Sequence, residues 1–114
     1  MVTIYHNPRC RESRATMKIL EEKGIKPNII EYLETPPDAA TLNDFLSKLG
    51  MEPRQLMRKG EAPYKELGLA DETKDRVALI EAMVENPILI ERPIVVNGEK
   101  VALGRPPENV LGIL

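Results

Sequence analysis

The sequence contains one cysteine, Cys10, in a setting that suits a reactive thiol. It follows a short β-like segment at residues 2–5 and begins a helical pattern. At such a strand-to-helix turn the first N–H groups of the helix are unpaired, and the helix dipole stabilises an anion. Both features favour the thiolate form of a cysteine. We therefore predict that Cys10 is a nucleophile.

Three arginines, Arg9, Arg11 and Arg14, lie close to Cys10 along the chain. A lone cysteine more often packs as a small buried apolar residue. Arginines seldom border such a position, because they are rarely buried. The charge pattern therefore favours a reactive cysteine over a structural one.

The composition is that of a small soluble protein. A length of 114 residues predicts a single domain over 1–114. The net charge is −2, and the chain has no Trp, one Phe and three Tyr. Few aromatic rings are therefore available to stack on bases, and phosphate-backbone binding is disfavoured. We expect no nucleic-acid partner.

The cysteine count also limits metal and disulfide chemistry. One cysteine cannot form an intrachain disulfide, and one cysteine with one histidine disfavours a zinc site, so we expect no metal. No signal peptide and no apolar run of membrane-spanning length is visible. We expect a cytoplasmic protein without membrane contact, in a compartment that keeps the thiol reduced.

The first third of the chain predicts a βαβ unit. Helical spacing continues from the Cys10 turn as far as Lys23, where Gly24 is a typical C-terminal stop. A second strand is expected at residues 28–33. Strand, helix and strand in about thirty residues imply parallel pairing with a right-handed crossover.

A mostly helical insertion is expected at about 38–86. Asp38 is positioned to cap a first helix that ends at Gly50, and Asp75 to cap a last one that ends at residues 86–87. Between them, residues 52–69 favour short helical pieces separated by Gly60 and Pro63. The residues expected to face inward are Leu42, Phe45, Leu46 and Leu49 in the first helix, and Val77, Ile80, Met83 and Val84 in the last.

A β-hairpin and a terminal helix complete the chain. Asn97-Gly98 between two β-rich runs, within residues 93–103, is a strong hairpin signal. The element order is that of an α/β, thioredoxin-like fold, a mixed sheet flanked by helices. In that fold a cis-proline begins the hairpin strand, so we expect a cis Arg92–Pro93 bond.

Five separated motifs resemble the arsenate reductases that work with glutathione and glutaredoxin. The resemblance runs in register over nearly the whole chain. The motifs are His6-Asn7-Pro8-x-Cys10-x-x-Ser13-Arg14, residues 32–37 (YLETPP), Leu56-Met57-Arg58, Arg92-Pro93-Ile94-Val95-Val96 and Gly104-Arg105-Pro106.

The resemblance implies that Cys10 attacks arsenate and that Arg58, Arg92 and Arg105 hold the oxyanion. Guanidinium suits this task because it is planar, always charged and has several donors. A single arginine is more often a solvated surface charge. Arg92 and Arg105 each stand next to a proline at a turn, which favours function. Without the resemblance, the two readings of Arg58 are evenly balanced.

Three further residues are expected to support the site. His6 could form a hydrogen bond that helps to hold the thiolate, or it could pin the end of the strand. Ser13 could donate to the thiolate, cap the helix, or both. Asn7 is expected to shape the loop.

Two related chemistries are disfavoured. A Cys-x5-Arg phosphatase loop would need an arginine where Thr16 stands, and a Cys-x-x-Cys redox protein would need a cysteine at Ser13. With no second thiol, any adduct of Cys10 must be resolved by an external thiol.

The resulting prediction is a monomeric arsenate reductase that uses glutathione as co-substrate and glutaredoxin as partner, with no bound cofactor. One alternative is a non-enzymatic adaptor of the same fold, like transcription regulators. Another is a glutathione-linked reductase of a different oxyanion or of mixed disulfides.

Overall fold

The computed structural model describes residues 1–114 and divides the chain into two compact units. The first combines Met1–Thr35 with Arg92–Leu114 and contains the sheet. The second, Pro36–Glu91, is helical, and it is the segment expected as an insertion at about 38–86.

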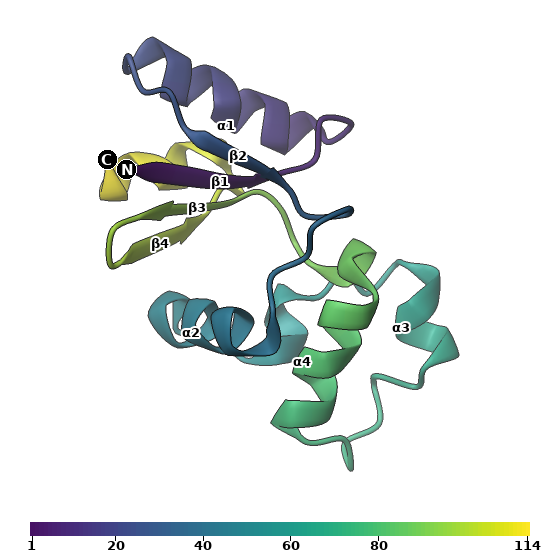
Figure 1. Cartoon of the computed structure of the whole chain (residues 1–114). Coiled ribbons are helices and arrows are strands. Elements are labelled where there is room, and N and C mark those ends of the chain that lie inside the picture. The colour runs from purple at the N-terminus through teal and green to yellow at the C-terminus, as the bar shows by residue number, and fades with distance from the viewer. The chain divides into compact units, whose positions relative to one another are not determined.

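A four-stranded mixed sheet forms the centre of the first unit, in the order β2-β1-β3-β4 (Figure 1). β1 pairs with β2 in parallel and with β3 antiparallel, and β3 and β4 form the antiparallel hairpin. The strands are β1 (Val2–His6), β2 (Asn28–Glu31), β3 (Ile94–Asn97) and β4 (Lys100–Leu103). The expected α/β architecture with a mixed sheet is confirmed.

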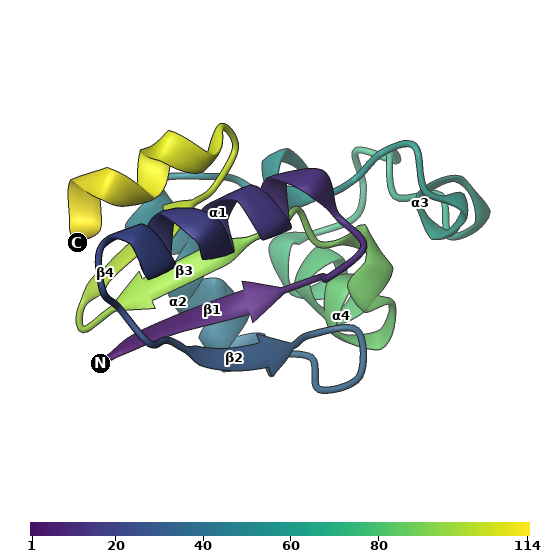
Figure 2. The same cartoon turned by 90° about the horizontal axis from the view of Figure 1, so that it is seen from above.

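Two helices, α1 (Arg11–Glu22) and the 3-10 helix η3 (Pro107–Ile113), lie side by side over one face of this sheet (Figure 2). Gly24 follows α1 with φ +71°, the left-handed conformation expected of a helix stop. The core between helices and strands is aliphatic, with Val2, Ile4, Leu20, Val95, Ala102 and Val110 buried. This packing holds the N-terminus of α1 close to the end of β1.

The second unit contains three α-helices and two 3-10 turns. Their bounds are α2 (Ala39–Leu49), η1 (Pro53–Leu56), α3 (Ala62–Glu66), α4 (Arg76–Glu85) and η2 (Pro87–Leu89). The predicted caps are confirmed, because Asp38 accepts from the N–H of Thr41 at 2.8 Å and Asp75 from that of Ala78 at 2.9 Å. No helix of the chain is long and apolar enough to cross a membrane.

Two expectations for this unit were wrong. Pro63 does not separate helical pieces but lies in the first turn of α3, where a missing N–H costs nothing. Val77 is 64% exposed, and Leu79 is buried in its place with Ile80 and Met83. Residues two apart on a helix point in nearly opposite directions, so the burial of Leu79 turns Val77 outward.

Candidate active site

Cys10 stands at the N-cap of α1, with extended backbone angles of φ −92° and ψ 128°. Its N–H donates to the carbonyl of Asn7 at 3.0 Å, and its carbonyl accepts from the N–H of Arg14 at 3.0 Å. Asn7 also accepts through Oδ1 from the N–H of Arg9, so it shapes the loop as expected. The cysteine is 7% exposed. The thiol therefore lies at the positive end of the helix, in a fixed turn.

Ser13 connects the first turn of α1 to the end of β1. Its fully buried hydroxyl accepts from the N–H of Asn7 at 3.0 Å and lies 2.6 Å from Nδ1 of His6. Its acceptor bond goes to Asn7, which lies before the helix, so the expected helix cap is not formed, and its donation to the thiolate stays a prediction. The hydrogen bond with His6 joins the end of β1 to the first turn of α1, within the loop that carries Cys10.

The His6 imidazole can act as the acceptor in this hydrogen bond. Burial lowers the pKa of His6 below its usual value, while the Glu31 carboxylate opposes the shift and the Arg14 guanidinium adds to it. A neutral imidazole protonated at Nε2 can accept at Nδ1. His6 and Ser13 thus hold the loop that carries the nucleophile.

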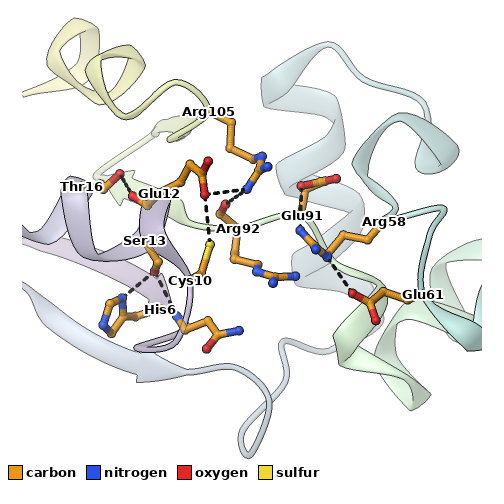
Figure 3. Close-up of polar contacts among 11 residues, drawn as sticks. His6, Cys10, Glu12, Ser13, Thr16, Arg58, Glu61, Glu91, Arg92 and Arg105 are labelled. Carbon is orange, nitrogen blue, oxygen red and sulfur yellow. Dashed lines mark hydrogen bonds and ion pairs between the residues drawn. The ribbon is translucent and has the colours of Figure 1, made fainter.

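The sequence analysis missed one residue that contacts the thiol, Glu12. Its Oε2 lies 3.5 Å from Cys10 Sγ and 3.6 Å from Nη1 of Arg105 (Figure 3). Its own backbone N–H holds the pKa of this carboxyl below its usual range, with smaller contributions from Cys10, Arg105 and Arg11. An acid in the first turn of a helix, two residues after a cysteine, was the available signal.

Arg105 connects this carboxylate to Arg92. Its Nη1 also donates to the Arg92 carbonyl at 3.2 Å. Arg92 precedes the expected cis bond to Pro93, which is confirmed, and a second cis bond joins Arg105 to Pro106. The structure thus brings Cys10, Arg92 and Arg105 of the first unit into one cluster through Glu12.

The guanidinium of Arg92 is the unusual member of this cluster. Its Nε and Nη1 are buried, and neither has a hydrogen-bond partner. A buried charged donor without an acceptor is costly, by about 1–3 kcal/mol or more. An oxyanion that accepts from both nitrogens would remove this cost.

Gly104 allows the Arg105 segment to approach α1 closely. A Cβ on Gly104 would lie 2.6 Å from Oγ1 of Thr16 and 2.8 Å from Cγ of Pro93. Its N–H donates to the Pro93 carbonyl at 2.9 Å. The absence of a side chain at Gly104 therefore allows Arg105 to lie beside the first turn of α1.

Arg58 belongs to the helical unit and has carboxylate partners there. Its Nε donates to Glu61 at 3.2 Å, and its Nη1 lies 3.7 Å from Glu91 (Figure 3). The 3-10 turn η1 and the bridge between Met57 and Ile90 fix its backbone. Its role as an oxyanion ligand stays a prediction from the resemblance.

The cluster in the first unit combines a thiol with two arginines and a carboxylate. No group of three or more His, Cys, Asp or Glu side chains in the chain is arranged to hold a metal ion. A thiol at a helix N-terminus beside two guanidinium groups can attack a bound oxyanion.

The model of the ArsC family matches residues 5–113. This chain belongs to the ArsC family. It is 58% identical over 114 residues to the uncharacterized protein YfgD of Escherichia coli K12, a match that covers 99% of this chain and 96% of that protein. It is 46% identical to an arsenate reductase of Neisseria meningitidis, over 99% of this chain and 97% of the relative.

A solved ArsC-type structure has nearly the same backbone. The arsenate reductase from Vibrio cholerae superposes with a TM-score of 0.95 at 51% identity, covering 99% of this chain and 97% of that one. The family resemblance drawn from the sequence motifs is thereby confirmed.

Proposed function

We propose that this protein is an arsenate reductase, an oxidoreductase that converts arsenate to arsenite. The observation that carries the proposal is the buried, unpartnered guanidinium of Arg92, whose main-chain carbonyl accepts from Arg105. Arg105 in turn pairs with Glu12, which contacts the Cys10 thiol. Membership of the ArsC family and relatives named arsenate reductase support it.

The first step in this proposal is nucleophilic. The Cys10 thiolate forms a bond to arsenic, and an arsenate oxygen leaves as water. Negative charge grows on the remaining oxygens, where Arg92 and Arg105 are suited to stabilise it through planar, charged donors.

The electrons must come from outside the chain. Reduction of arsenic(V) to arsenic(III) takes two electrons, and Cys10 is the only thiol of the protein. A glutathione thiol then replaces a second oxygen on arsenic, again releasing water. A glutaredoxin thiol attacks the glutathione sulfur, the S–As electron pair stays on arsenic, and a glutathione–glutaredoxin disulfide forms. Hydrolysis of the remaining S–As bond releases arsenite and restores Cys10.

This scheme needs glutathione as co-substrate and glutaredoxin as partner, but no bound cofactor. We propose that the protein acts in the cytoplasm, because the reaction needs a reducing glutathione pool, and that it works as a monomer.

The test is arsenite formation by purified protein with arsenate, glutathione and glutaredoxin. Turnover is expected with both donors, and none with Cys10→Ser. Thioredoxin in place of glutaredoxin is expected to support little turnover, since it acts best on protein disulfides. Full turnover with thioredoxin and no glutathione would contradict the donor assignment. No arsenite under any condition would contradict the function.

A further inference from the structure

One oxygen of Glu12 occupies the position between the nucleophile and an arginine of the cluster. Oε2 is 3.5 Å from Cys10 Sγ and 3.6 Å from Arg105 Nη1 (Figure 3). An oxyanion that is bound by Arg105 and attacked by Cys10 must place an oxygen within similar distances of both atoms. The carboxylate therefore lies where an oxyanion oxygen is needed.

A carboxylate and an oxyanion cannot share this position. At about 4 Å like charges repel strongly in a partly buried site, and each needs the same guanidinium. The lowered pKa of Glu12 keeps the carboxyl charged at neutral pH, so protonation does not relieve the conflict. One of the two anions has to leave.

The Glu12 side chain is free to leave. It is 36% exposed and the Arg105 side chain 31%, so the carboxylate can rotate into water and the ion pair between them is partly solvated. Such partly solvated ion pairs contribute little to stability. A multiply charged oxyanion, which can also engage Arg92, can displace the carboxylate.

We propose that Glu12 is an internal competitor for the oxyanion. In the resting protein its carboxylate accepts the Cys10 thiol hydrogen and pairs with Arg105, and substrate binding displaces it. This inference rests on the proposed function for the identity of the oxyanion, arsenate. It makes Glu12 a residue that sets substrate affinity, without a bonding role in the reaction.

The test measures anion binding without turnover, through alkylation of Cys10 by the uncharged reagent iodoacetamide at pH 7. Arsenate at increasing concentration should protect the thiol. In Glu12→Gln the half-protecting arsenate concentration should fall about fivefold, which corresponds to about 1 kcal/mol. The alkylation rate without arsenate should rise severalfold, because the thiol loses its carboxylate acceptor.

Glu22→Gln is the matched control. It removes the same charge from an exposed position in the last turn of the same helix. Its half-protecting concentration should stay within about twofold of the wild-type value. Glu12→Asp keeps the charge at the helix N-terminus but withdraws the carboxylate by one methylene, so an intermediate value is expected even if Glu12→Gln folds poorly.

A double-mutant cycle isolates the competition for Arg105. In an Arg105→Met background, Glu12→Gln should give a much smaller gain, because no ion pair remains to be broken. An equal gain in both backgrounds would overturn the inference.

The remaining outcomes separate this inference from the proposed function. An unchanged half-protecting concentration in Glu12→Gln, or no protection by arsenate in any variant, overturns the inference. Tighter arsenate binding in Glu12→Gln without arsenite formation by either protein supports the inference and contradicts the proposed function.

Discussion

Nη1 of Arg105 donates to the main-chain carbonyl of Arg92 at 3.2 Å. The two arginines lie thirteen residues apart in the sequence, on either side of the β3–β4 hairpin. The hydrogen bond ties the side chain of one to the backbone of the other. The side chain of Arg105 is thus fixed against the strand end that carries Arg92.

We predict that Arg92→Lys lowers kcat/KM for arsenate by about tenfold or more. Lysine keeps the charge but loses the planar donors, and with them about one charge-assisted hydrogen bond. Arg105→Lys should act similarly, since it also loses the bond to the Arg92 carbonyl. Steady-state kinetics check this, with the exposed Arg11→Lys as control. Unchanged kinetics in both site variants would place these arginines outside the site.

A mixed disulfide between Cys10 and glutathione should accumulate when glutaredoxin is omitted. Glutathione can attack the sulfur of the arsenate adduct, and without a second thiol in the chain nothing internal reverses the product. Intact-mass analysis after incubation with arsenate and glutathione should show one added glutathionyl group, which glutaredoxin removes. Cys10→Ser should show none. An unmodified wild-type mass would count against this route.

The His6–Ser13 hydrogen bond predicts a pH dependence of stability. The pKa of His6 is lowered in the folded state by burial, so below about pH 6.5 the unfolded chain binds the proton more readily. The free energy of unfolding should therefore fall with pH from about 6.5 down to the lowered folded value. Carboxyl groups whose pKa is lowered by folding also reduce the free energy of unfolding as the pH falls. Their contribution is the same in a variant without the histidine.

His6→Asn isolates the histidine contribution. Its amide oxygen can still accept from Ser13 but does not titrate in this range. Urea unfolding at pH 7.5 and 5.0 should show a smaller loss of stability in the variant than in the wild type. An equal loss in both proteins would show that His6 titrates as it does in water.

Gly104→Ala should destabilise the protein by about 1–3 kcal/mol and weaken arsenate turnover. The new Cβ would meet Thr16 Oγ1 at 2.6 Å and push the Arg105 segment away from α1. Gly60→Ala is the control, because nothing lies within 4 Å of its Cβ position and its φ is not positive. That change should be neutral or slightly stabilising. Chemical denaturation compares the two, and similar effects would contradict the packing argument.

Much of the fold follows from local rules that act over a few residues. The N-cap position of Cys10, the caps Asp38 and Asp75 and the Asn97-Gly98 hairpin were all predictable. Each depends on residue type and a short spacing that backbone geometry imposes. The cis bond before Pro93 followed from the element order together with the fold it indicated.

By itself, then, the sequence determined that the chain has a single thiol, and it determined the order of the elements. Tertiary structure decided which side chains meet: Glu12 pairs with Arg105, and the Ser13 hydroxyl contacts His6. It also turned Val77 outward and Leu79 inward. These contacts depend on the rotation of each helix against its neighbours and on pairings between residues far apart in the chain. Both are fixed only when the whole core packs.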